Sequence, residues 1–116
     1  MSKEILAVDA DEVLFPFLDE FLNFNAGLTG KTLNKSEFKS YEFSGPLGIT
    51  IPETLDRIFF FHKNIDNTQV QPIDGSKIGV EKLASAFDLI VVTARDSEFE
   101  RETLSWLKEH FSDYFK

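Results

Sequence analysis

Two acidic residues near the N-terminus have a spacing that suits nucleophilic and acid–base chemistry beside a bound cation. Asp9 ends the short apolar run Ile5–Val8, and Asp11 follows two residues later. Two carboxylates this close repel each other, and a bound cation relieves that repulsion. If the strand continued, alternation would put both side chains on one side, where one could attack and the other move a proton. The alternative is a strand end followed by a solvated acidic turn.

A second polar group follows another apolar run. Leu89–Val92 is apolar, and Thr93, Ala94 and Arg95 come directly after it. A threonine at the end of a strand can offer its hydroxyl and backbone N–H to a phosphate. Arg95 could add a charged donor. The alternative is an ordinary β-branched strand end followed by a surface arginine.

The two apolar runs must position these groups. Both are too short for helices and too apolar for exposed strands, which predicts two buried parallel strands. Ligands of open α/β sheets bind beyond the carboxyl ends of the strands, so Asp9 and Thr93 are expected at one edge. They are 84 residues apart (93 − 9), whereas a crossover needs only about a dozen residues and a helix. The excess predicts a helical cap, residues 15–73, inserted into a core formed by residues 1–14 and 74–116.

Helical patterns fill the predicted cap. Pro16 suits the first turn of a helix that ends between Asn25 and Gly30. Residues 41–48 are predicted as a loop. Thr50 and Glu53 form a capping box before a second helix. The residues expected inside these two helices are Phe17, Leu18, Phe21 and Leu22 in the first, and Leu55, Ile58, Phe59 and His62 along one face of the second.

Two more helices are expected in the core. Asp74 is predicted to cap a helix that runs to about Ala86, with Ile78 and Leu83 facing inward. Ser97 and Glu100 are predicted to form a capping box before a helix that ends near His110. Its expected buried residues recur every four positions: Phe99, Thr103, Leu107 and Phe111.

Composition excludes several classes of function. The chain has 116 residues, 12 of them basic and 20 acidic, and no cysteine. This length suits one domain, and the acidic balance argues against binding nucleic acid through its phosphates. There is no apolar run long enough to span a membrane, and no signal sequence at the start. We therefore expect a cytoplasmic protein that binds neither membranes nor nucleic acid.

Together these motifs resemble the haloacid dehalogenase (HAD) superfamily of phosphatases. Asp9-Ala10-Asp11 matches its first motif and Thr93 its second. Within the superfamily, the chain resembles the 5′(3′)-deoxyribonucleotidase-like branch, which carries a helical cap directly after the first motif. The implied fold is α/β: a partial HAD-like Rossmannoid parallel sheet with a helical cap inserted after the first strand. The stretches that carry the resemblance are Asp11-Glu12-Val13-Leu14, Tyr41-Glu42-Phe43 and Val92-Thr93-Ala94-Arg95.

The resemblance implies a Mg²⁺-dependent phosphomonoesterase acting on a small phosphorylated substrate, a nucleoside monophosphate. Asp9 would be the nucleophile that forms an aspartyl-phosphate. Asp11 would protonate the leaving alcohol and then activate water. The Asp9 carboxylate and the Asp11 backbone carbonyl would hold Mg²⁺, and Thr93 would bind a phosphate oxygen. Phe15, Phe17 and Phe43 are candidates for lining the substrate pocket.

Two departures from the family pattern matter. Glu12 stands where glycine is commonest, and nothing after Thr93 matches the lysine and aspartates of the third and fourth motifs. Lys63 and Lys77 are possible substitutes for that lysine, although a solvated helix face is the simpler interpretation of each. The alternative function is a truncated, non-catalytic remnant that binds phosphate or a partner chain. A third interpretation takes Asp-x-Asp as a nucleotide-sugar metal site of a glycosyltransferase.

Two predicted strands leave one long apolar edge open, which favours a homo-oligomer through that edge or a longer gene product.

The remaining aromatic and basic residues have ordinary explanations. His62 and His110 fall at helix C-termini, where each can interact with the helix dipole. The rings of Phe59–Phe61 cannot all face one core.

Overall fold

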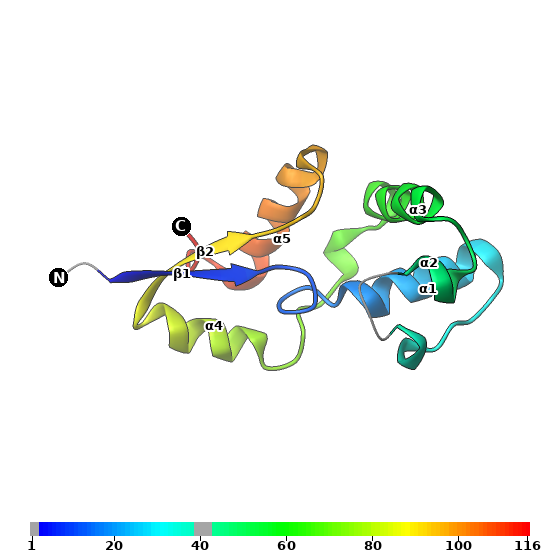
Figure 1. Ribbon diagram of the computed structural model, residues 1–116. Coiled ribbons are helices and arrows are strands. Elements are labelled where there is room, and N and C mark those ends of the chain that lie inside the picture. The colour runs from blue at the N-terminus through cyan, green and yellow to red at the C-terminus, as the bar shows by residue number, and fades with distance from the viewer. Residues whose placement is uncertain (1–2, 39–42) are drawn as a thin grey trace. The chain divides into compact units, whose positions relative to one another are not determined.

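The computed structural model describes residues 3–38 and 43–116, which form two compact units (Figure 1). An α/β unit comprises Met1–Pro16 and Asn67–Lys116, and a helical unit comprises Phe17–Asp66. The helical unit is therefore inserted into the α/β unit between the first strand and the rest of the sheet. Tyr41 and Glu42, two of the residues that carry the family resemblance, lie outside the described residues.

Two parallel strands form the sheet of the α/β unit. Strand β1 spans Glu4–Asp9 and β2 spans Phe87–Val92, with Glu4 opposite Phe87 and Asp9 opposite Val92. The predicted strands and their parallel pairing are confirmed. The C-terminal residues add a contact that the sequence did not predict: Phe115 forms a parallel bridge with Leu89, and the Lys116 N–H donates to the Leu89 carbonyl at 2.8 Å.

The prediction that both strands are buried is wrong: in β2 Leu89 is the one buried residue and Val92 is exposed, and β1 has no buried residue. Its side chains alternate between half-buried and exposed, and Ile5 is 70% exposed. Leu6 and Val8 share a face with the fully buried Leu89, since register partners in a parallel pair point the same way. The opposite face of β1, with Ile5, Ala7 and Asp9, is exposed. Its outer edge has no strand partner among residues 3–38 and 43–116.

Helix α4 (Ser76–Ala84) precedes β2, and its start and inner face differ from the prediction. Gly75, with φ 84°, is the residue before the helix, so Asp74 is not the cap. Glycine adopts this left-handed conformation without steric cost. Val80 is buried, whereas Ile78 and Leu83 are exposed. In this nine-residue helix the inward stripe is centred on Val80, which leaves the two larger residues outside it.

Helix α5 (Glu100–Phe111) follows β2 after the short 3₁₀ helix Ser97–Phe99. The Asp96 side chain caps the 3₁₀ helix by accepting from the Glu98 N–H at 2.9 Å, and α5 begins after Phe99 with no side-chain cap, so the predicted Ser97–Glu100 capping box is wrong. The predicted burial of Phe99, Thr103, Leu107 and Phe111 is confirmed. Trp106 lies in this core as well, and its indole N–H donates to the Val70 carbonyl at 3.0 Å. Val70 belongs to the segment that leads from the 3₁₀ helix Asn67–Gln69 toward α4.

In the helical unit, α1 (Phe17–Thr29) and α3 (Ile51–Asn64) pack around phenylalanine rings. The predicted inner residues of α1 are buried, and Thr50 and Glu53 form the predicted capping box. Two predictions are wrong. The inner face of α3 carries Thr54 and Phe61, whereas Leu55 is exposed. Residues 44–47 of the predicted loop form one helical turn, α2 (Ser44–Leu47), and a 3₁₀ turn (Lys35–Glu37) precedes it.

Candidate active site

The parallel register of the sheet brings the two predicted motifs together. Asp9 is the last residue of β1 and lies opposite Val92, the last residue of β2. The next backbone N–H, that of Ala10, still donates to the Val92 carbonyl at 3.3 Å. Asp9 and Thr93 therefore leave the sheet from neighbouring strands at one edge, and both residues are exposed. This arrangement is the one that the sequence predicted.

The strand does not continue from Asp9 to Asp11, because a tight loop begins at Ala10. The Ala10 carbonyl accepts from the backbone N–H groups of Leu14 and Phe15, both at 2.9 Å. The Glu12 N–H donates to the Phe15 carbonyl at 2.8 Å, and Glu12 has φ 65°. This is the left-handed region, which costs a residue with a side chain about 1–2 kcal/mol. The residue that stands where the family usually has glycine thus adopts a glycine-like conformation.

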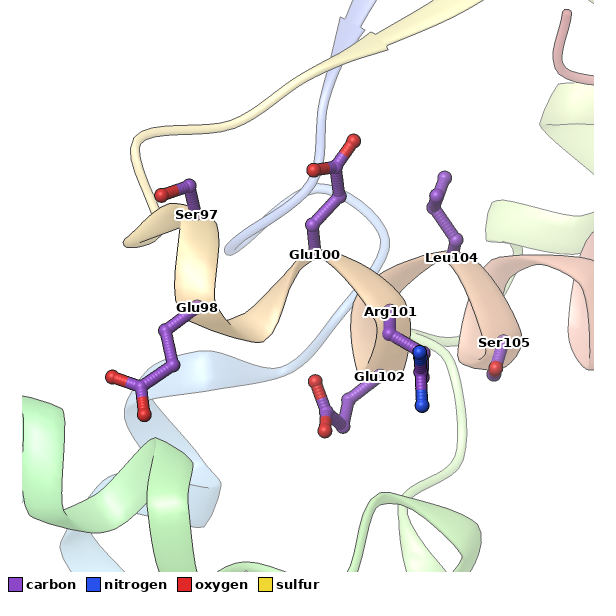
Figure 2. Close-up of a pocket in the computed structure, with 7 residues that line it drawn as sticks. All are labelled: Ser97, Glu98, Glu100, Arg101, Glu102, Leu104 and Ser105. Carbon is purple, nitrogen blue, oxygen red and sulfur yellow. The ribbon is translucent and has the colours of Figure 1, made fainter.

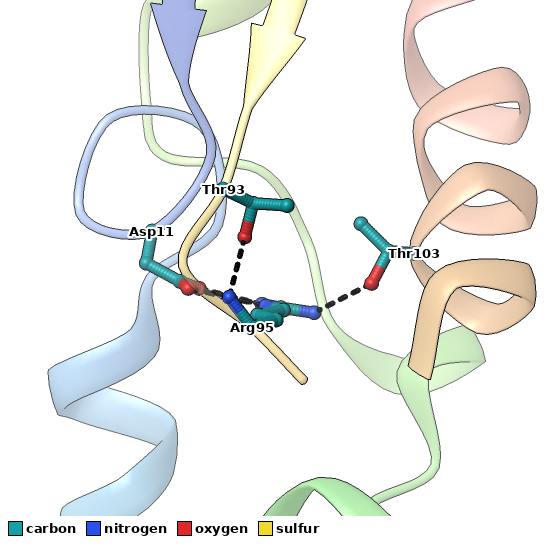
Figure 3. A network of polar contacts seen from close by, with 4 residues as sticks. All are labelled: Asp11, Thr93, Arg95 and Thr103. Carbon is teal, nitrogen blue, oxygen red and sulfur yellow. Dashed lines mark hydrogen bonds and ion pairs between the residues drawn. The ribbon is translucent and has the colours of Figure 1, made fainter. Parts of the chain in front are cut away.

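The loop aims Asp11 at Arg95 (Figure 3). Arg95 Nη2 donates to Asp11 Oδ1 at 2.6 Å, and Arg95 Nε lies 3.2 Å from Oδ1 and 3.1 Å from Oδ2. The Arg95 side chain is 4% exposed and that of Asp11 is 27% exposed. A guanidinium that donates from two nitrogens to a carboxylate makes stronger hydrogen bonds than neutral groups do. The Arg95 guanidinium is therefore directed to Asp11.

Thr93 keeps a position suited to a phosphate ligand. Its Oγ1 accepts from the Arg95 backbone N–H at 3.1 Å, which fixes the turn after β2. A hydroxyl that accepts one hydrogen bond can still donate its own proton. Ala94 is exposed beside it.

Comparison with known proteins gives the family. The profile of the family "5′ nucleotidase, deoxy (pyrimidine), cytosolic type C protein" matches residues 3–115. The chain belongs to this 5′ nucleotidase family. It is thus a member of the nucleotidase-like branch of the HAD superfamily. No curated protein matches the chain significantly.

Solved structures give the same fold for this nucleotidase-family chain. One similar structure is a haloacid dehalogenase-like hydrolase from Streptococcus pneumoniae, with 13% identity and a TM-score of 0.64. Another is the HAD-hydrolase YfnB from Bacillus subtilis bound to magnesium, with 18% identity and a TM-score of 0.54. The chain is covered over 99% and 100% of its length, but it spans only 59% and 64% of these two proteins. The α/β fold expected from the sequence is confirmed.

The three phenylalanines predicted to line a pocket fall in different units. Phe15 is buried in the α/β unit, where its ring packs edge-on against Trp106 with centroids 5.0 Å apart. The Arg95 Cζ lies 4.3 Å from the centroid of the same ring. Phe17 and Phe43 belong to the helical unit and stack on each other, with centroids 6.4 Å apart. Phe43 is half-buried.

The described residues of the nucleotidase-family chain hold no cluster of three or more histidine or acidic side chains that could bind a metal ion. Lys63 and Lys77 are exposed. His110 is in the last turn of α5, as predicted. Burial lowers the pKa of His110, and the nearby Lys77 lowers it further.

A shallow depression lies along the start of α5 (Figure 2). Its lining residues all come from the segment 97–105 and include three glutamates: Glu98, Glu100 and Glu102. None of the predicted site residues lines it, and its acidic character disfavours a phosphate ester. The candidate site therefore lies at Asp9, Asp11 and Thr93.

In the described part of the chain, no helix has the length and apolar character needed to cross a bilayer.

Sequence reasoning missed two contacts of Arg95. One is the Phe15 ring, and the other is Thr103 Oγ1, which lies 3.4 Å from Arg95 Nη1. Thr103 was predicted only as a core position of α5. The sequence does carry a sign of such a contact: Thr103 stands among apolar residues that recur every four positions. A hydroxyl buried on such a helix face needs a hydrogen-bond partner from another element.

Proposed function

We propose that this chain carries the phosphoryl-transfer residues of a HAD-type phosphomonoesterase that acts on nucleoside monophosphates. The observation that carries the proposal is the register of the sheet. It brings an exposed carboxylate, Asp9, and an exposed hydroxyl, Thr93, to the ends of two paired strands. Phosphoryl transfer needs a nucleophile and a phosphate ligand held near each other, and neighbouring strand ends can supply both. Membership of the 5′ nucleotidase family supports the substrate class.

The donor set suits Mg²⁺ bound together with a substrate. Mg²⁺ prefers oxygen ligands, and protein sites often supply only one or two carboxylates, with water and substrate phosphate completing the shell. The Asp9 carboxylate and the Asp11 backbone carbonyl are the ligands we propose. When bound, the ion would offset the repulsion between the Asp9 carboxylate and the phosphate dianion.

The proposed reaction has two steps. Asp9 attacks phosphorus, and the bond between phosphorus and the ester oxygen breaks. A proton from the Asp11 carboxyl group neutralises the departing alkoxide. Water then attacks phosphorus while Asp11 takes up one of its protons, and the bond between phosphorus and the Asp9 oxygen breaks. Inorganic phosphate leaves, and both aspartates return to their starting forms. Thr93 donates to a phosphate oxygen, and the Ala94 backbone is a second proposed ligand.

The helical unit is the proposed substrate-selecting cap. Phe17 and Phe43 would supply rings for stacking on a base, which is favourable for any base because each has a π-face. Phe43 is the better candidate of the two, since Phe17 is buried. Replacing Phe43 with Ala should raise the KM for a deoxynucleotide and leave the KM for 4-nitrophenyl phosphate unchanged.

The test measures hydrolysis of 4-nitrophenyl phosphate and of deoxynucleoside monophosphates, with Mg²⁺ or with EDTA. Asp9→Asn should abolish turnover of both substrates. Asp113→Asn, an exposed aspartate beyond the end of α5, is the matched control and should keep wild-type rates. Turnover that persists in EDTA and survives Asp9→Asn would reject the mechanism.

A second candidate function is phosphate binding without turnover. The observation that favours it is the exposed Thr93 at the end of β2, because a hydroxyl there can bind phosphate whether or not Asp9 reacts. Calorimetry separates the two candidates: binding of inorganic phosphate by a chain that hydrolyses neither ester would favour the second.

We also propose that the outer edge of β1 pairs with a second copy of the chain. The support is an edge without a strand partner in the described residues and an apolar side chain, Ile5, that is largely exposed beside it. Light scattering at micromolar concentration should report a dimer, and a monodisperse monomer would contradict this proposal.

A further inference from the structure

We propose that Arg95 is a positioning residue that fixes the Asp11 carboxylate so that Oδ2 is the atom that carries the transferred proton. This inference rests on the proposed function, in which Asp11 is the acid and base. It differs from the sequence-based expectation, in which Arg95 donates hydrogen bonds to the phosphate.

The first observation is the unequal loading of the two carboxylate oxygens. Oδ1 faces two Arg95 nitrogens, Nη2 at 2.6 Å and Nε at 3.2 Å. Oδ2 accepts from Nε at 3.1 Å and shares that donor with Oδ1. Oδ1 is therefore the anchored atom. Oδ2 keeps more of its hydrogen-bonding capacity for a proton and a reacting oxygen.

The second observation is that Arg95 is held from several sides, whereas Asp11 is not enclosed. Phe15 lies under the guanidinium and Thr103 faces Nη1, as described above. The Arg95 backbone N–H is tied to Thr93. Only 4% of the Arg95 side chain is exposed, against 27% for Asp11. The arginine is thus the fixed member of the pair, and the aspartate is the more accessible member.

The chemistry suits this division of roles. A guanidinium does not lose its proton in proteins, so Arg95 cannot replace Asp11 as the acid. In the first step, the Oδ2–H bond breaks and the proton moves to the ester oxygen as the phosphorus–oxygen bond breaks. In the second step, a proton of the attacking water returns to Oδ2. Arg95 keeps all its protons throughout and contributes orientation only.

Leaving-group dependence tests the inference. 4-Nitrophenolate departs without a proton, whereas the alkoxide of a deoxynucleotide needs one. The measured quantity is kcat/KM, which reports the steps up to phosphoryl transfer and excludes hydrolysis of the intermediate. General acid catalysis contributes about 10²–10⁴-fold. Arg95→Met should therefore lower kcat/KM about 100-fold for a deoxynucleotide and less than about 5-fold for 4-nitrophenyl phosphate.

Two further variants complete the series. Arg95→Lys keeps the charge but lacks the planar fork, so it should recover only a small part of the lost deoxynucleotide activity. Arg101→Met removes an exposed arginine of α5 and should leave both substrates at wild-type rates. Equal losses on the two substrates, or a gain on the deoxynucleotide, would overturn the inference.

An NMR measurement tests the pair without turnover. In the wild type, the Arg95 Nε–H should exchange with solvent at least 10 times more slowly than the Nε–H of Arg101, and Asp11→Asn should remove most of this protection. Fast exchange in the wild type would refute the inference, whether or not the chain is active. If Asp9→Asn keeps turnover while the Arg95 Nε–H is protected, the proposed function fails and the pairing stands.

Discussion

Replacing Phe61 with Ala should unfold the helical unit under mild conditions. The Phe61 side chain is fully buried, and its ring meets three other phenylalanine rings, those of Phe17, Phe21 and Phe24, with centroids 5.4–5.6 Å apart. Truncating a buried phenylalanine to alanine lowers the free energy of unfolding by about 3–5 kcal/mol, because the transfer free energy of the ring is lost and the cavity left behind adds a further cost. Edge-on contacts between aromatic rings stabilise the core beyond the effect of buried apolar area alone. A cost at the upper end, about 4–5 kcal/mol, follows for the free energy of unfolding.

Phe60 supplies the control at the neighbouring position of α3. Its side chain is 46% exposed, and the nearest described ring is that of Phe24 at 5.7 Å. Phe60→Ala leaves no sealed cavity and loses about half of the burial, so it should cost about 1 kcal/mol. Urea unfolding followed by circular dichroism, with amide exchange in α1 and α3 as the local readout, compares the two variants. Equal costs for Phe60→Ala and Phe61→Ala would refute the assignment of Phe61 to the centre of this core.

Three further outcomes are expected. Thr50→Ala should destabilise α3 by about 1 kcal/mol, because Thr50 Oγ1 accepts from the Glu53 N–H at 3.2 Å; Thr50→Ser should restore the stability in thermal unfolding. Because burial and Lys77 lower the pKa of His110, the unfolded chain takes up the proton first as the pH falls below 6.5. The urea midpoint should therefore drop between pH 7.5 and pH 5.5, and less so in His110→Gln. Glu12→Gly should raise the free energy of unfolding by about 0.5–1 kcal/mol, since it removes the left-handed strain but adds chain entropy; a lower melting temperature would mean that contacts of the Glu12 side chain outweigh that strain.

Short-range patterns predicted the elements of this fold well. Apolar runs located β1 and β2, and the four-residue recurrence from Phe99 to Phe111 located the buried face of α5. These patterns depend on local periodicity, which the sequence carries directly. The predicted capping box at Thr50 is present for the same reason: its hydrogen bonds join residues three positions apart.

Predictions about which side of an element is inside were less successful, because tertiary packing decides them. Ile78 and Leu83 are larger than Val80, yet Val80 is the buried residue of α4. In β1, apolar character suggested burial on both faces, but Ile5 is exposed on one of them. An apolar side chain is buried only where another element packs against it, and the sequence of one element does not show where the neighbouring elements lie.

The partner of Arg95 is the part of the site that the sequence could not specify. A guanidinium presents the same fork to a carboxylate and to a phosphate, so residue type alone leaves both roles open. Position along the chain does not decide either, since Asp11 and Arg95 are 84 residues apart. The decision depends on the tight loop after β1, which turns Asp11 away from the line of the strand, and on the burial of the arginine against Phe15. That loop requires a left-handed residue at Glu12, where glycine would be the easier choice. Because the loop that holds Glu12 also sets the direction of Asp11, a backbone change at Glu12 should alter the Asp11–Arg95 pair before it alters the sheet.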